Sequence, residues 1–451
     1  MLFNSYNFLV FLLIYIIFIY TFPKKWKNIS IIFSALFYIS WSFKFYFIIL
    51  IICLILKYFS DKLRSSENNK YLFFCIFILL CNLIFFKYTT DLIDFLVPVN
   101  SFNLNNTIIL PIGISFYTFQ SISYIIDINK NKIKPYSFVD LLFYISFFPQ
   151  IIAGPIVRVK NFFKNYQDTL IFKKKRIKKS LILILWGFFL KIAVADNLAL
   201  YSDKVFNNLE NFNSASILVA TVFYSFQIYT DFFAYSLIAI GICKLVNIDI
   251  PSNFNTPYFS TSIIDFWRRW HISLSTFLRD YLYIPLGGNK NGNLVAYRNV
   301  IITMTLGGIW HGSGINFLFW GVGHGILIVL NKLVNFNFFI PKPIKVFFVF
   351  VMVTLLWVPF RIDNIVDVLY VYKALFSLEI FEYKEIFSKS LFIKCLLVLT
   401  VLLLVDFLFS KKKLVMILKN DYKFSIYIGV LLFLTSLFYA DYSKAFIYFQ
   451  F

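Results

Sequence analysis

Long apolar runs recur along the whole chain and constrain its fold more than any other feature. Residues 6–22 and 390–409 are two of them, and each approaches the about 20 residues that cross a bilayer as a helix. The runs are continuously apolar and do not alternate in polarity, which favours helical spans over a β-barrel. Only 14% of the residues are charged and 60% are hydrophobic, whereas soluble domains carry about a quarter charged residues. We therefore expect an all-α polytopic membrane protein.

The basic residues lie mainly in short loops between the apolar runs. The net charge is +21, and clusters stand at 23–27, 130–134, 172–179 and 411–413. This is the positive-inside pattern, with membrane lipids as partners through their anionic headgroups, and it argues against a nucleic-acid partner. The run 6–22 is predicted to stay as the first span, because its lysines follow the apolar stretch and do not precede it.

Placing these loops in the cytoplasm predicts about eleven crossings. They belong to a single integral-membrane domain that covers 1–451. Segment 137–154 contains "FFPQIIAGPI" between basic loops and is expected to be re-entrant. Residues 247–298 are expected to form short interfacial or partly sunken helices. Residues 299–331 hold two apolar stretches split at "HGSG", too short for two full spans, and predict a broken hairpin that ends inside the membrane. The other expected spans are 29–56 (a hairpin), 71–88, 107–126, 180–200, 214–246, 344–360, 390–409 and 424–440.

The stretch "DFWRRWHISLSTFLRDYLYIPLGG" (265–288) is unusually polar for this chain. It contains Asp265, Arg268, Arg269, His271, Arg279 and Asp280. On one continuous helix, Arg268 and His271 would share a face at i,i+3. One interpretation is an amphipathic interfacial helix with snorkelling arginines. The other is a cationic site that holds a phosphate-bearing donor by bidentate contacts.

Histidine is scarce, with three in 451 residues, and His311 stands inside "GGIWHGSG" (307–314). A buried imidazole costs stability unless it is hydrogen-bonded, so ionisable groups inside a membrane are functional candidates. His311 is either a satisfied core histidine or a general base, since imidazole titrates near neutral pH. His271 lies upstream on a segment that can fold back on it. His324 lies between Gly321 and Gly325, a small-residue pair that predicts close helix packing and a structural role.

Several classes of site are missing from the sequence. No phosphate-binding loop, nucleophile elbow or H-E-x-x-H pair occurs. The three histidines are dispersed, and the five cysteines lie in apolar runs without metal or redox spacing, which argues against a metal site. A base and cationic anchors without an obvious nucleophile favour direct transfer of an activated acyl group to a hydroxyl. A polysaccharide or lipid-linked sugar exporter, which performs no acyl chemistry, is the alternative.

Several segments together resemble the membrane-bound O-acyltransferase (MBOAT) family, and most closely its bacterial branch for alginate and peptidoglycan O-acetylation. They are "PIGISFYTFQSISYIIDI" (111–128), "FFPQIIAGPIVR" (147–158), "SFQIYTDFFAYSLIAIG" (225–241), the stretch 253–288 with "RRWHISLS" and "RDYLYIPLGG", "GGIWHGSGINFLFWG" (307–321) and the C-terminal "FIYFQF" (446–451). The resemblance extends from the first residues to the last.

The resemblance implies a ring of helices around a central tunnel. His311 matches the family's essential histidine at the base of that tunnel, and His271 its second, more cytoplasmic histidine, so both are candidate catalytic residues. The expected donor substrate is acetyl-CoA or another acyl thioester, with no bound cofactor and no metal. The candidate donor-binding residues are Arg268, Arg269, Trp310, Arg279 and Asp280.

The same resemblance implies a multi-pass protein of the bacterial inner membrane that O-acetylates a cell-envelope polysaccharide. The acetyl group would pass directly or through a periplasmic partner of the SGNH type. Transfer of D-alanine to teichoic acid ranks lower, because the relatives with that activity usually lack the "YIPLGG" continuation. Ala234 and Phe277 depart from the glycine and tryptophan that are frequent in relatives, and either change could reshape the cavity.

Overall fold

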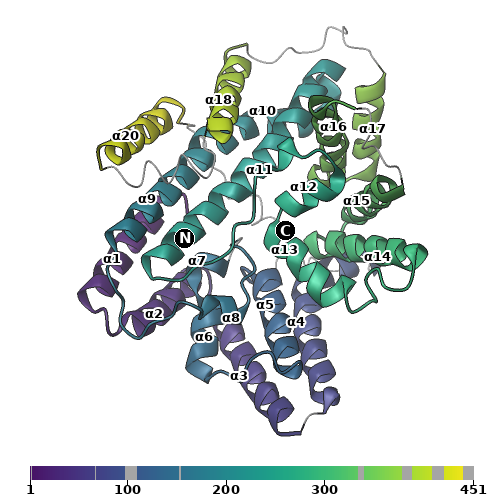
Figure 1. Ribbon diagram of the computed structural model, residues 1–451. Coiled ribbons are helices and arrows are strands. Elements are labelled where there is room, and N and C mark those ends of the chain that lie inside the picture. The colour runs from purple at the N-terminus through teal and green to yellow at the C-terminus, as the bar shows by residue number, and fades with distance from the viewer. Residues whose placement is uncertain are drawn as a thin grey trace. The chain divides into compact units, whose positions relative to one another are not determined.

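A computed structural model describes residues 1, 3–66, 68–96, 109–151, 154–333, 340–377, 389–408 and 421–439. Within these ranges every regular element is a helix. The chain divides into two compact units, the first comprising Met1–Ser180 and Ala239–Pro251, the second Leu181–Ile238 and Ser252–Phe451 (Figure 1). Helices α9 (Lys174–Phe188) and α11 (Ser214–Leu245) each run from one unit into the other. The expected single membrane domain stays a prediction.

Among its described residues, the first unit contains eight helices and the adjoining ends of α9 and α11. The eight are α1 (Tyr6–Thr21), α2 (Trp26–Ile39), α3 (Phe43–Ser66), α4 (Asn69–Leu96), α5 (Ile114–Asn129), α6 (Phe138–Ser146), α7 (Phe148–Ile151) and α8 (Val159–Phe162). Helix α3 packs on α4, α5 and α6, and α2 packs on α1 and α3. The segment 137–154, which is expected to be re-entrant, holds the two short helices α6 and α7, and its re-entrance stays a prediction. Neither helix is long enough to cross a bilayer.

The second unit begins with the rest of α9, which continues as a π-helical turn, η2 (Phe189–Ala195), and α10 (Asp196–Phe206). After η3 (Leu209–Asn211) and α11 come the short elements expected for 247–298. They are η4 (Pro257–Phe259), α12 (Ile263–Arg269), α13 (Ile272–Leu278) and η5 (Arg279–Tyr283). The helices described after residue 292 are α14 (Asn293–His311), α15 (Ile315–Leu333), α16 (Lys342–Arg361), α17 (Ile365–Phe376), α18 (Lys389–Leu408) and α20 (Asp421–Leu437).

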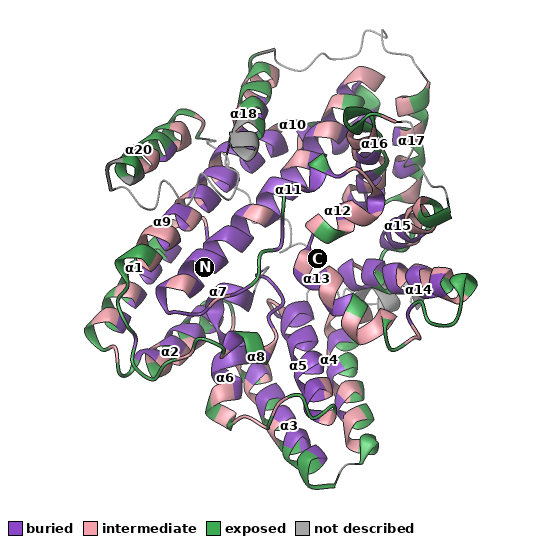
Figure 2. Ribbon diagram, in the orientation of Figure 1, coloured by how far each residue is buried: buried purple, intermediate pink, exposed green. Residues whose placement is uncertain are grey.

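Six described helices are long and apolar enough to cross a membrane: Phe43–Ser66, Asn69–Thr89, Lys174–Phe206, Ser214–Leu245, Ile315–Leu333 and Lys342–Arg361. Four shorter apolar helices accompany them, so the protein is a multi-pass membrane protein, but the predicted number of about eleven crossings is not confirmed. Many large apolar side chains on these helices are exposed, as on the outer face of α4 at Phe73 and Phe77. By contrast, α11 is almost wholly buried (Figure 2).

The segment 299–331 was expected to be too short for two full spans. Of its two helices, α15 has 19 residues and is one of the six candidate spans, whereas α14 is not among them, so the broken hairpin stays a prediction. The glycines of α15 do not end it, because Gly321 and Gly325 lie against the backbone of α14 and Gly323 against Leu356. The break at "HGSG" is real and falls between His311, the last residue of α14, and Ile315, the first of α15.

Candidate functional site

The segment around His271 is not one continuous helix. Helix α12 ends at Arg269, Trp270 is extended, and His271 has a left-handed backbone with φ 40° at the start of α13. The expectation that Arg268 and His271 share one helical face is therefore wrong. Two backbone hydrogen bonds hold the break: Ile272 N–H donates to the Asn253 carbonyl (2.9 Å) and Asn255 N–H to the Arg269 carbonyl (3.0 Å).

Asn253 anchors this turn further, although the sequence analysis did not single it out. Its buried side-chain Nδ2 donates to Ser236 Oγ on α11 at 3.0 Å. Ser273 Oγ on α13 donates to Asn253 Oδ1 at 2.6 Å. Buried amides normally require such partners, so Asn253 joins the His271 turn to α11. An asparagine in a loop gives no sequence signal for this role.

The fold brings all three histidines of the chain into one aromatic cluster. We define the histidine cluster as His271, Trp310, His311, Trp320 and His324. The ring centroid of Trp310 lies 6.4 Å from that of His271 and 4.9 Å from that of His311. The ring centroid of Trp320 lies 5.0 Å from His311 and 4.9 Å from His324. The histidines are 1%, 3% and 0% exposed in chain order. The prediction that the His271 segment folds back toward His311 is confirmed.

Close approach of two helices positions the cluster. A Cβ added at Gly308 of α14 would lie 2.3 Å from the Phe317 carbonyl oxygen of α15. A Cβ added at Gly321 would lie 2.5 Å from the Met304 carbonyl oxygen. Only glycine permits this backbone approach. It places His311, at the end of α14, against Trp320 of α15, and it confirms the predicted packing role of the small residues around His324.

The imidazole of His324 is buried among aromatic rings. Its ring lies parallel to Phe266 at 6.3 Å and edge-on to Trp267 at 5.0 Å. Among the described residues, neither ring nitrogen of His324 has a hydrogen-bond partner. A buried polar group without a partner costs stability, so a purely structural role, which stays a prediction, leaves this cost unexplained.

The candidate donor-binding arginines differ in their surroundings. Arg268 is exposed at the end of α12. Arg269 Nε lies 2.9 Å from Asp265 Oδ1, and Arg279 Nε lies 2.7 Å from Asp280 Oδ1. Both pairs are partly exposed and hold the guanidinium planes in place, while they neutralise part of the charge that an anionic donor would meet. Trp310 is buried between His271 and His311.

His271 lies outside the six candidate spans, and its surroundings decide its charge. Burial lowers the pKa of its imidazole from 6.5 to about 3. The neutral ring is therefore the form present at physiological pH. A neutral imidazole at this turn can orient neighbouring groups, and it does not add a positive charge for an anionic donor.

A buried ion triad in the second unit was missed by the sequence analysis. Lys191 Nζ, on the π-helical turn η2, lies 2.7 Å from Asp231 Oδ1 of α11 and 2.9 Å from Asp196 Oδ1 of α10. A lysine and two aspartates inside apolar runs were a usable signal, because charges at that depth require partners. Their pairing could not be inferred, since Asp231 is 40 residues from Lys191.

The two departures from the family pattern lie in the second unit. Ala234 is buried on α11, and a Cβ added at Gly187 would lie 2.7 Å from its carbonyl oxygen. Phe277 is buried on α13, with its ring centroid 4.9 Å from that of Tyr281. Their effect on a cavity stays a prediction, as does the central tunnel. The C-terminal motif 446–451 and the basic loop 411–413 lie outside the described residues.

Comparison with known proteins identifies the family. The family model of the membrane-bound O-acyltransferases matches residues 126–358, which include the turn at His271 and the whole histidine cluster. The chain belongs to the membrane-bound O-acyltransferase family. It is an O-acyltransferase, as the motifs around His271 and His311 predicted.

Three relatives illustrate the range of this similarity. The probable alginate O-acetylase of Pseudomonas aeruginosa is 34% identical, with 86% of this chain and 77% of the relative covered. The peptidoglycan O-acetyltransferase of Helicobacter pylori is 36% identical, with 79% and 74% covered. The teichoic acid D-alanyltransferase of Streptococcus thermophilus is 29% identical, with 67% and 71% covered. The O-acetylating relatives are thus more similar to this chain, and over more of its length.

Proposed function

We propose that this enzyme moves an acetyl group from a cytoplasmic thioester of the acetyl-CoA type to a hydroxyl of a cell-envelope polysaccharide such as peptidoglycan or an alginate-like polymer. The bacterial inner membrane is the proposed location. The observation that carries the proposal is the placement of His311, buried at the helix break and surrounded by Trp310, Trp320 and Phe360. The names of the relatives that match over most of the chain support polysaccharide O-acetylation.

In the proposed reaction His311 is the general base. One ring nitrogen accepts the proton of the acceptor hydroxyl as its oxygen attacks the thioester carbonyl carbon. The C–S bond then breaks, and the leaving thiolate takes the proton from the imidazolium, which regenerates the neutral ring. Aromatic rings around His311 exclude water, which protects the thioester from hydrolysis and strengthens the electrostatic interactions of the reacting groups.

The other predicted site residues have supporting roles in this proposal. His271 is proposed as a positioning residue, because its ring lies edge-on to Phe232 at 4.6 Å and 6.4 Å from Trp310, the residue next to His311. Arg268, Arg269 and Arg279, with their partner Asp280, are proposed to meet the anionic part of the donor. Arg268 is exposed and, unlike Arg269 and Arg279, forms no ion pair with a described carboxylate, so it is the best placed of the three for a soluble ligand. Arg268→Gln is expected to raise KM for the donor and to leave kcat nearly unchanged.

Two acceptors of the acetyl group are compatible with the proposed reaction. Either the polysaccharide hydroxyl reaches the site directly, or a serine of a periplasmic SGNH-type partner accepts the acetyl group and passes it on. Transfer of D-alanine is the second candidate activity, supported by a relative of lower identity and coverage. An exporter without acyl chemistry is not favoured, since the relatives are named as transferases.

The test uses the purified full-length enzyme in vesicles with acetyl-labelled coenzyme A and a polysaccharide acceptor, with and without an SGNH-type partner. Loss of the general base in His311→Gln is expected to reduce acetyl transfer by about 10²–10⁴-fold. His324→Asn is the matched control, since it removes an equally buried histidine from the same cluster. It is expected to lower stability more than turnover.

Two results would contradict the assignment. Equal loss of turnover in His311→Gln and His324→Asn, at matched folded fractions, would assign the effect to packing of the cluster. A rate that is flat between about pH 5 and 8 would argue against a histidine base, because imidazole changes its protonation in this interval. Intact thioester in every vesicle preparation would reject acyl transfer altogether.

A further inference from the structure

A polar pocket lies within the first unit. The residues that line it differ from the residues that the sequence analysis assigned to acyl transfer. The volume of the pocket is about 260 Å³, far more than the ~10–15 Å³ that one water molecule needs. It is lined by Lys164, Asn165, Tyr166, Gln167, Lys173, Arg176 and Asn247. The walls are thus the loop 164–167, the beginning of α9, and the residues that follow α11.

The lining of this pocket is cationic and rich in hydrogen-bond donors. Three of its side chains are basic, three are amides and one is a phenol, and none carries a negative charge. Residues 164–179 hold seven basic residues and a single acidic one, Asp168. Such a lining attracts an anion and offers it donors from several directions.

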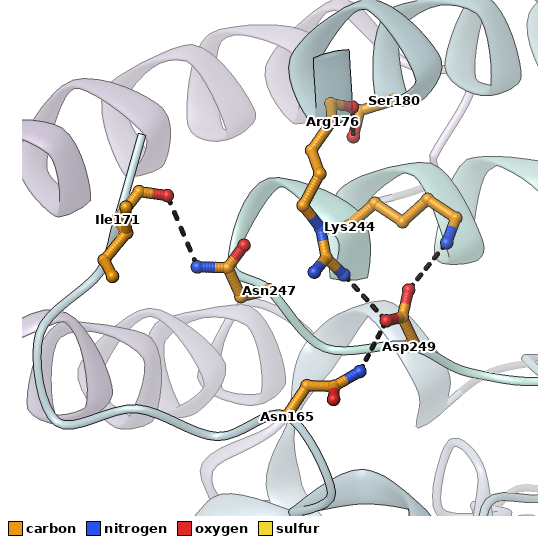
Figure 3. A network of polar contacts seen from close by, with 7 residues as sticks. All are labelled: Asn165, Ile171, Arg176, Ser180, Lys244, Asn247 and Asp249. Atoms are coloured by element: carbon orange, nitrogen blue, oxygen red, sulfur yellow. Dashed lines mark hydrogen bonds and ion pairs between the residues drawn. The ribbon is translucent and has the colours of Figure 1, made fainter. Parts of the chain in front are cut away.

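The carboxylate of Asp249 contacts two of the lining residues, Arg176 and Asn165 (Figure 3). Its oxygens lie 2.8 Å from Arg176 NH2 and 2.7 Å from Lys244 Nζ, and they accept a hydrogen bond from Asn165 Nδ2 at 2.7 Å. One negative charge is therefore shared between two cations. In the part of the chain that the structure describes, no carboxylate forms an ion pair with Lys164 or Lys173. The pocket retains an excess of positive charge.

The loop wall is held in place before any ligand binds. Trp26 Nε1 donates to the Gln167 carbonyl at 2.9 Å, and Leu170 N–H donates to the Pro23 carbonyl at 3.0 Å. Asn247 Nδ2 donates to the Ile171 carbonyl at 3.4 Å on the opposite wall. A fixed lining lowers the entropy cost of ligand binding.

The first turn of α9 carries positive charge, which is unfavourable at the N-terminus of a helix. This turn holds Lys174, Lys175 and Arg176 and no acidic residue. A helix N-terminus is the positive end of the helix dipole, so basic residues there are unfavourable unless an anion offsets them. These basic residues and the helix N-terminus add to the positive potential beside the pocket.

We propose that this pocket is a phosphate-binding site, which receives the phosphate of an anionic lipid headgroup or of a soluble phosphorylated ligand. The Arg176 guanidinium, fixed by Asp249, can present its remaining N–H groups to phosphate oxygens, while Lys164 and Lys173 act as point charges. The amides of Asn165, Gln167 and Asn247 add neutral polar contacts. The proposal does not depend on acyl transfer, since it concerns binding alone.

The experiment compares two double variants of the full-length protein in detergent, without an acyl donor. Lys164→Gln with Lys173→Gln removes two positive charges from the pocket and leaves the Asp249 contacts intact. Lys130→Gln with Lys134→Gln removes the same charge from exposed lysines elsewhere in the first unit. Native mass spectrometry counts retained phosphatidylglycerol molecules against phosphatidylcholine, and calorimetry measures binding of inorganic phosphate.

Loss of the two lysines is expected to weaken phosphate recognition about tenfold, in line with two lost charge-assisted contacts. If retention of phosphatidylglycerol falls only in the pocket variant, the proposal holds with a lipid as the source. If binding of inorganic phosphate falls only in the pocket variant, it holds with a soluble ligand. Equal behaviour of the two double variants in both assays would overturn the proposal.

Discussion

Two lysine–aspartate networks in this protein have the same contact distances and opposite surroundings. In the buried triad of the second unit, Lys191 lies 2.7 and 2.9 Å from two carboxylates, and the side chains are 2–3% exposed. In the first unit, Asp249 lies 2.7 and 2.8 Å from Lys244 and Arg176, with side-chain exposures of 39%, 15% and 25%. The contact distances alone would predict equal contributions to stability. The difference in burial decides how much each network contributes to the free energy of unfolding.

The physical difference lies in what happens when a partner is removed. A partly exposed charge returns to water at little cost, so such pairs contribute little to stability. A charge left in a dry interior has no such alternative, and its desolvation is no longer offset. The triad is therefore a requirement of the fold, whereas the Asp249 network can serve a ligand.

The largest expected effect is that of Lys191→Met. It leaves two aspartates buried without their shared cation and is expected to destabilise the protein by about 3–5 kcal/mol. Thermal unfolding of the purified protein in detergent measures it. The control combines Lys191→Met with Asp196→Asn and Asp231→Asn, which removes the stranded charges and is expected to restore much of the stability. If Lys191→Met alone were as stable as the parent protein, burial of the triad would not determine its contribution to stability.

The second effect concerns His271, a buried group that avoids the cost of charge by staying neutral. Its pKa of about 3 lies below the 6.5 of the unfolded chain. The stability from neutral burial is therefore complete above pH 6.5 and falls as the pH drops from 6.5 toward 3. At pH 4.5 the loss should be about 2–3 kcal/mol.

Denaturation midpoints between pH 7.5 and 4.5 measure this loss. His271→Asn removes the titrating group, so the contribution of His271 to the pH dependence of stability is expected to disappear. His324→Asn is expected to retain this contribution. A wild-type protein and a His271→Asn variant with the same slope would contradict a neutral, buried His271.

A smaller effect is expected for Asp249→Asn. The side chain is isosteric, the pairs are partly exposed, and the loss of stability should be about 1 kcal/mol or less. The same thermal assay as for Lys191→Met gives the direct comparison. A destabilisation as large as that of the triad variant would mean that Asp249 is effectively buried in the membrane-embedded protein.

The smallest effect is that of salt. Raising the ionic strength from about 0.01 to about 1 M shortens the screening length from about 30 to about 3 Å. The stability difference between the parent and Asp249→Asn should then shrink toward zero. The difference between the parent and Lys191→Met should stay nearly constant, because solvent ions do not reach the triad. If the stability differences of Asp249→Asn and of Lys191→Met from the parent depended equally on salt, the two networks would not differ in their exposure to solvent ions.

Much of the secondary structure followed from local properties of the sequence. The expected spans 214–246 and 344–360 correspond to α11 and α16, because long apolar stretches favour helices wherever lipid or protein surrounds them. The break at "HGSG" was also visible, since glycine weakens a helix locally. The continuity of α15 across its glycines has a tertiary cause, because these glycines lie against neighbouring helices.

The sequence by itself determined the membrane class, the family and the identity of the scarce histidines, because these depend on composition and on short motifs. Only the tertiary structure decided that His271, His311 and His324 share one aromatic cluster, and that Lys191 pairs with Asp231. These contacts join residues distant in the chain, and they depend on how closely backbones such as those at Gly308 and Gly321 approach. Packing at that range is set by the shapes of many side chains together, which no local pattern encodes.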